Sequence, residues 1–143
     1  MLFRSVIASR AASHALNEKR AVSDLPIPPW DEGTAKIAND DRAIISHAWD
    51  EIRRLMWYYV GIIRSERRLK CALGRIINIK QELDNYYWDF QVDRDLLEVR
   101  NLAEIAHLTI RCAMARKESR GIHYTIDHPQ PLPNHSIKDT VIW

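Results

Sequence analysis

The chain has 143 residues, of which 46% are hydrophobic, and this length and composition are typical of one globular domain with its own core. Its 21 basic and 19 acidic side chains nearly cancel, so the charge balance does not favour nucleic acid or an anionic membrane as a partner. The longest apolar run, residues 55–63, is far shorter than the ~20 residues of a membrane-spanning helix. Neither Cys71 nor Cys112 lies in a CxxC motif, and we expect two reduced thiols in a cytoplasmic protein.

Residues 1–16 contain two arginines, several alanines and serines and no acidic residue, a composition that resembles a mitochondrial presequence. The alternative is the end of a helix whose earlier part is missing and whose apolar side has lost its partner. That side would carry Leu2, Phe3, Val6, Ile7 and Ala11. We favour the helix fragment over the presequence.

Residues 17–38 form a predicted surface linker, because three prolines and Gly33 prevent a continuous helix. Within the linker, Trp30 is expected to dock into a neighbouring groove, since a side chain of that size gains much free energy by burial. The first long helix is predicted to begin near Asn39, a good N-cap residue, and to end at Gly61. Its predicted core residues recur at spacings of four and three: Ile45, Trp49, Ile52, Met56, Tyr59 and Ile63.

Two further helices are predicted after this one. The second runs from Ser65 to about Phe90, and the third from Asp95, in a capping box with Glu98, to Gly121. The core residues of the second helix are Leu69, Ala72, Ile76, Ile79, Leu83, Tyr86 and Phe90. Those of the third helix are Leu96, Val99, Ala103, Ala106, Ile110 and Ala113. Spacings of three and four place each series on one face of its helix.

These stripes and their short connections predict an all-α fold. We expect an antiparallel three-helix bundle over residues 39–121, similar to a spectrin repeat, preceded by the helix fragment and the linker. Residues 122–143 contain Pro129, Pro131 and Pro133 and are predicted to form an extended, proline-rich tail. Because this tail is too short for a core, it needs another surface to lie against.

The sequence contains few patterns that are typical of catalytic, nucleotide-binding or metal-binding sites. The four glycines are far apart, so neither a GxGxxG motif nor a P-loop is present. His123, His128 and His135 have no cysteines nearby, which favours solvent-facing or interface histidines over a metal site. The basic residues between positions 53 and 70 are interleaved with acids, which favours a salt-bridged surface over a phosphate-binding patch. We therefore predict no catalytic, cofactor-binding or metal-binding residue in this chain.

Two runs of the sequence resemble the C-terminal domain of bacterial L-aspartate oxidases, within the succinate dehydrogenase and fumarate reductase flavoprotein family. They are WDEIRRLMWYYVGIIR at 49–64 and MARKESRGIHYTIDHP at 114–129, with LEVRNL at 97–102 between them. The resemblance covers about residues 45–130. It implies a three-helix bundle and places the FAD and aspartate sites in domains that precede the matching region. Residues 1–16 would then be the end of a helix of the FAD domain.

The function that the resemblance implies is structural. The chain would be the docking domain of an FAD-dependent enzyme that converts L-aspartate to iminoaspartate for NAD synthesis, and it would be inactive alone. Its partners would be the missing FAD-binding and capping domains, and the isolated chain could self-associate. The expected interdomain contacts are Ser119, Arg120, Gly121, His123, Tyr124, Asp127 and Pro129. The alternative is an independent helical module that binds another protein.

Overall fold

The computed structural model describes residues 2–18, 26–29 and 42–142, which form two units divided between Asp31 and Glu32. The described part of the first unit contains helix α1, Leu2–Asn17. The described part of the second contains α2, Arg42–Tyr59; α3, Glu66–Asp89; and α4, Arg94–Ala115. It also has two short strands, β1 at Ile63–Arg64 and β2 at Tyr124–Thr125, and a 3-10 turn, η1, at Asn134–Ser136. The predicted all-α class is confirmed.

Helix α1 spans the segment for which a helix fragment was predicted. All of its described side chains, residues 6–17, are exposed within their own unit. The assignment of this helix to a flavin-binding domain stays a prediction. The predicted docking of Trp30 and the predicted helix start at Asn39 lie outside the described residues.

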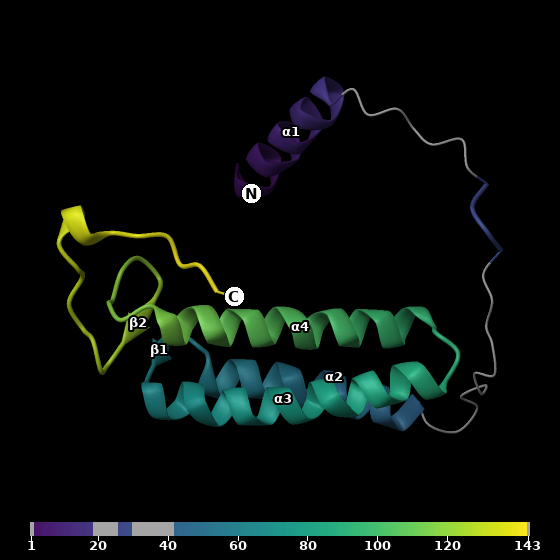
Figure 1. The fold of residues 1–143 in the computed structure, drawn as a ribbon. Helices are drawn as coiled ribbons and strands as arrows, with labels where there is room; N and C mark the ends of the chain where they lie inside the picture. The colour runs from purple at the N-terminus through teal and green to yellow at the C-terminus, as the bar shows by residue number, and fades with distance from the viewer. Residues whose placement is uncertain (1, 19–25, 30–41, 143) are drawn as a thin grey trace. The chain divides into compact units, whose positions relative to one another are not determined.

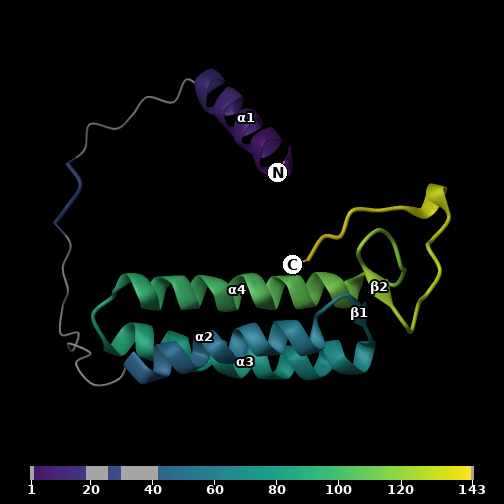
Figure 2. The same cartoon turned by 180° about the vertical axis from the view of Figure 1, so that it is seen from behind.

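Helices α2, α3 and α4 lie side by side, and each runs opposite to the one before it (Figures 1 and 2). The six predicted core residues of α4 are all buried, and so are those of α3 except Phe90, which packs at the edge of the core. In α2 the inward face is rotated slightly from the prediction. Ala48 and Leu55 are buried there, whereas Trp49 and Met56 lie at the core's edge. The prediction of Ile63 as a core residue is wrong, because α2 ends at Tyr59 and Ile63 lies exposed in β1.

The helix starts show one confirmed cap and one corrected cap. Ser65 caps α3, where its hydroxyl accepts a hydrogen bond from the Arg68 N–H at 3.3 Å. Asp95 was predicted to cap α4, but Asp93 does so, accepting from the Leu96 N–H at 2.8 Å. Asp93 has the extended backbone that an N-cap needs, and Asp95 lies in the first turn.

The end of α4 also differs from the prediction. The helix stops at Ala115, six residues before Gly121, because the following residues turn away to bind one another. Gly121 does have a left-handed backbone, with φ of 60°, but in a tight turn that joins Arg120 to His123. Gly61 has no positive φ; a Cβ there would lie 2.9 Å from the carbonyl oxygen of Trp57, so this position requires glycine for space.

The segment after α4 packs against the bundle around β2, so this part of it does not need the surface of another domain. Strand β2 pairs in parallel with β1, Ile63 opposite Tyr124 and Arg64 opposite Thr125. The Ile126 N–H donates to the Arg64 carbonyl at 3.0 Å. This corrects the expectation of an unsupported tail from residue 122, and it closes the end of the bundle at which α2 ends and α3 begins.

Candidate docking site

The C-terminal loop, defined as residues 116–132, folds around the carboxylate of Glu118, which is only 2% exposed. One oxygen accepts from Arg116 Nη1 at 2.5 Å, and the other accepts from Arg120 Nε at 2.9 Å and from the Leu132 N–H at 3.0 Å. The Leu132 N–H and then the two guanidinium groups lower the pKa of Glu118, although burial acts in the opposite direction. The carboxylate thus stays ionised at neutral pH and joins the two ends of the loop.

Ser119 holds the middle of the loop together. Its hydroxyl donates to the His128 carbonyl at 2.7 Å and accepts from the Thr125 N–H at 3.0 Å. Its own N–H donates to the Gln130 carbonyl at 3.3 Å. Thr125 is buried beneath these bonds. One hydroxyl therefore satisfies backbone groups that β2 and the following turn leave without a strand partner.

His123 connects the loop to the end of the bundle. Its Nδ1 lies 2.7 Å from Nη1 of Arg64, and its Nε2 lies 3.3 Å from the Arg116 carbonyl oxygen. A guanidinium can only donate, so Nδ1 accepts and the proton resides on Nε2, which donates to the carbonyl. Burial lowers the pKa of His123, and the charges of Arg64 and Arg116 act in the same direction. The geometry holds the imidazole neutral.

A group of charged side chains joins the loop to the first turn of α3. Asp127 Oδ2 accepts from the Glu66 N–H at 2.6 Å, which places a carboxylate at the positive end of the helix. The Glu66 carboxylate receives Lys117 Nζ at 2.5 Å and lies 3.2 Å from His128 Nε2. Lys117 and then His128 lower the pKa of Glu66. These contacts fix the loop on α3 as well as on itself.

The structure divides the seven predicted contact residues into two sets. Four use their polar side chains inside the chain: Ser119, Arg120, His123 and Asp127. The other three are exposed: Gly121, Tyr124 and Pro129. Next to them Ile122 is 90% exposed, at the tip of the turn. The structure brings all seven into one loop, and their contact with another domain stays a prediction.

Several residues that build this site were not predicted from the sequence. The predicted helix from Asp95 to Gly121 includes Glu118, whereas the structure shows Glu118 as the buried centre of the loop. The one available signal is the placement of Arg116 and Arg120 two positions on either side of it, because residues two apart on a helix do not face each other. Arg64 and Glu66 were assigned to a charged surface, and their partners lie some sixty residues later in the chain.

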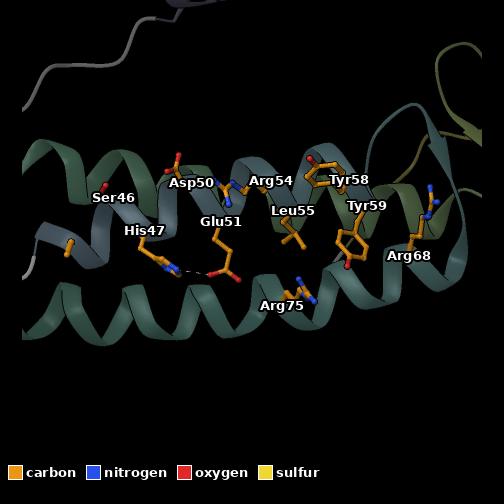
Figure 3. A pocket seen from close by; sticks show the side chains of 11 residues that line it. Ser46, His47, Asp50, Glu51, Arg54, Leu55, Tyr58, Tyr59, Arg68 and Arg75 are labelled. Carbon is orange, nitrogen blue, oxygen red and sulfur yellow. Dashed lines mark ion pairs between the residues drawn. The ribbon is translucent and has the colours of Figure 1, made fainter.

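A groove of about 910 Å³ lies between α2 and α3 (Figure 3). Its charged lining mixes both signs: Asp50, Glu51 and Arg54 come from α2 and Arg75 from α3, and Glu51 lies 3.8 Å from Nδ1 of His47. The Arg75 guanidinium lies 5.3 Å from the ring centroid of Tyr59. The lining is helical side chains throughout, so it offers no backbone N–H groups to hold a phosphate. The groove therefore gives no specific indication of a nucleotide.

Residues 49–143 match the family described as the fumarate reductase flavoprotein C-term. The chain belongs to this family. The matched residues include most of α2, the whole of α3 and α4, and the C-terminal loop. The site described above therefore lies within the residues that match the family, whereas α1 lies outside the match.

Among curated proteins, the chain is similar to bacterial L-aspartate oxidases. It is 50% identical to L-aspartate oxidase of Yersinia pestis over 109 residues, which are 76% of this chain and 20% of that protein. The values for L-aspartate oxidase 1 of Ralstonia nicotianae are 46% over 129 residues, 90% of this chain and 24% of that protein. The chain is 41% identical to L-aspartate oxidase of Pseudomonas aeruginosa over 143 residues, which are 99% of this chain and 26% of that protein. The chain spans about a fifth to a quarter of the length of these relatives.

The residues of this flavoprotein-family chain do not fit FAD. A dinucleotide requires closely spaced glycines that let the backbone approach the pyrophosphate. The two glycines that are closest to each other in this sequence are Gly61 and Gly74. Gly74 lies in the middle of α3. Within the described ranges, no group of His, Cys, Asp and Glu side chains is arranged to hold a metal ion. No described helix is both long enough and apolar enough to cross a membrane.

Proposed function

We propose that this chain is a non-catalytic docking domain of an FAD-dependent L-aspartate oxidase. The whole enzyme would convert L-aspartate to iminoaspartate in the biosynthesis of NAD. The observation that carries the proposal is the identity of 41–50% to L-aspartate oxidases over 76–99% of the chain. The partner would be the FAD-binding part of the same polypeptide, and α1 would belong to that part.

The geometry of the C-terminal loop supports a structural role. A catalytic acid or base must have a free atom that reaches the substrate. The Glu118 carboxylate accepts from three donors inside the chain, and both ring nitrogens of His123 have partners inside it. These groups fix the shape of a surface that exposes Gly121, Ile122 and Tyr124. A fixed surface of this kind suits docking, because little conformational entropy is lost on binding.

The proposal includes a cytoplasmic location. Cys71 and Cys112 form no disulfide with each other and lie on different helices, α3 and α4. Unpaired thiols are typical of reducing compartments.

A chimeric enzyme tests the proposal. This chain would replace the matching residues of the Pseudomonas aeruginosa L-aspartate oxidase, to which it aligns over 143 residues. We expect the chimera to retain FAD, measured by its visible absorbance, and to consume L-aspartate. The matched control carries Ile76→Asp, which buries a charge in the bundle core and should remove both properties. A chimera without flavin, or an isolated chain that is yellow or consumes aspartate, would contradict the proposal.

A further inference from the structure

Helix α4 has a second apolar face opposite the one that packs in the core. Beyond the buried residues, its outward side carries a stripe at spacings of four, four, three and four. The members of this outer stripe are Leu97, Asn101, Ile105, Leu108 and Cys112. Ile105 is 61% exposed and Leu108 is 40% exposed. The stripe contains no charged side chain.

The outward faces of the other two helices are different. In α2 that face carries Asp50, Arg53 and Arg54, and in α3 it carries Lys70 and Gln81, all exposed. Most of these side chains are suited to water, although α2 also exposes Trp57 and Tyr58 near its end. A helix that is apolar on two opposite sides is expected between two packed layers. Of the three helices of the bundle, α4 is therefore the one whose outward stripe is mostly apolar and without charge over about four turns.

The C-terminal half of the outer stripe forms the floor of a groove of about 400 Å³. Its apolar lining includes Ile105 and Leu108, and its other lining residues are Arg64, Thr109, Cys112, Ala113, Arg116, His123 and, from the C-terminal segment, Thr140. Arg116 holds this segment at the side of the groove, because its Nε donates to Thr140 Oγ1 at 3.1 Å and its Nη2 to the Lys138 carbonyl at 3.0 Å. Figures 1 and 2 show the segment returning along α4 from the end of the loop. The last residues thus shape the groove and leave Ile105 exposed.

We propose that the outer stripe of α4 is the face on which the FAD-binding part of the same flavoprotein docks. This inference rests on the proposed function and adds a contact on α4 to the surface of the C-terminal loop described above. About three quarters or more of the length of each relative lies outside the matched region, so in those proteins a large further part belongs to the same polypeptide. The stripe itself has no charge, so we expect an apolar surface on the partner opposite Ile105 and Leu108, whereas Arg64 and Arg116 in the lining of the groove would face polar groups.

The two native cysteines provide a test with an internal control. Cys112 belongs to the outer stripe, whereas Cys71 is exposed on α3. N-ethylmaleimide would be added to the isolated chain and to the chimera with the Pseudomonas aeruginosa enzyme, and the labelled peptides quantified by mass spectrometry. In the chimera we expect the labelling rate of Cys112 to fall to about one tenth or less of its rate in the isolated chain, as for a group that requires local opening. The labelling rate of Cys71 should be the same in both.

A pair of matched variants separates this face from the rest of the bundle. Ile105→Glu places a charge on the outer stripe, and Ile77→Glu places one on the outward face of α3, where Ile77 is 46% exposed. We expect the Ile105 variant of the chimera to lose flavin and the protection of Cys112, and the Ile77 variant to retain both. Neither change should alter the circular dichroism of the isolated chain, since both side chains are exposed in it.

The outcomes distinguish the two proposals. An active chimera in which Cys112 reacts as in the isolated chain, or in which both variants behave alike, would overturn the docking face and leave the proposed function standing. A second copy of this chain is the competing occupant. It would be indicated by an isolated chain that sediments as a dimer and becomes monomeric with Ile105→Glu while the chimera stays active with that change. An original chimera without flavin would contradict both proposals.

Discussion

Helices α3 and α4 bury alkyl side chains along their whole length, whereas the C-terminal loop buries a carboxylate and a threonine. In the helices, each buried side chain contributes by its apolar area, in whatever direction it points. In the loop, Glu118 and Ser119 contribute through hydrogen bonds that need defined distances and angles. The comparison shows that the bundle's stability and the shape of its end depend on different interactions, and substitutions can separate them.

The largest expected effect is a cavity in the bundle. Ile76 is fully buried, so Ile76→Ala should lower the free energy of unfolding by about 2–5 kcal/mol through lost burial and an unfilled space. Ile77→Ala, one position along on the outward face, should change it by less than about 0.5 kcal/mol. Urea denaturation followed by circular dichroism measures both. Equal losses at the two positions would contradict the packing described for α3.

The next effect is local to the C-terminal loop. Glu118→Gln keeps the side chain's shape but removes the charge that holds Arg116 and Arg120, and its amide NH₂ cannot accept a hydrogen bond. We expect hydrogen exchange at the Leu132 amide to accelerate while exchange in the middle of α3 is unchanged. Glu98→Gln, on the exposed side of α4, is the control. Uniform acceleration across the chain would show that loop and bundle unfold together.

A smaller loss is expected from a single hydroxyl. Ser119→Ala leaves the Thr125 N–H and the His128 carbonyl without their partner and should cost about 1 kcal/mol. The exposed Ser46 of α2 supplies the control, Ser46→Ala. Thermal denaturation of the two variants gives the comparison. If Ser119→Ala were neutral, the loop's backbone groups would have to find other partners at no cost.

The smallest effect concerns pH and His123. Its pKa is lowered from the usual 6.5, so its contribution to stability is complete above that value and is lost as the pH falls through the folded-state pKa. Protonation also gives the ring a positive charge that is repelled by the Arg64 guanidinium. Stability measured in urea from about pH 7 to about pH 5 should fall less steeply in His123→Gln than in the original chain. Identical slopes would contradict the neutral imidazole. Glu118 and Glu66, whose pKa values are lowered from 4.5, titrate below this window.

The sequence predicts the bundle well because helical periodicity is a local property. Every predicted core residue of α4 is buried, since spacings of three and four identify a face without reference to its partner. The cap of α4 was displaced because Asp93 and Asp95 both precede the stripe and both suit the position. Local preference alone does not choose between them.

The C-terminal loop was not predicted because its stabilising partners are distant in sequence. Arg116 and Lys117 are good helix formers and Gly121 is a common helix stop, so local preference extends α4 through them. Tertiary contacts overrule it: Arg64 meets His123 fifty-nine positions later and Glu66 meets Asp127 sixty-one positions later. Only Gly121's left-handed backbone was foreseen correctly, and it serves a turn within the loop.

The carboxylate of Asp127 over the first turn of α3 has a consequence for biosynthesis. The Ser65 cap is available as soon as α3 leaves the ribosome, but the Glu66 N–H waits for a residue translated sixty-one positions later. During elongation, α3 is thus complete at its far end before its beginning is closed. A nascent chain that ends before Asp127 would leave the Glu66 N–H without this acceptor at the first turn of α3.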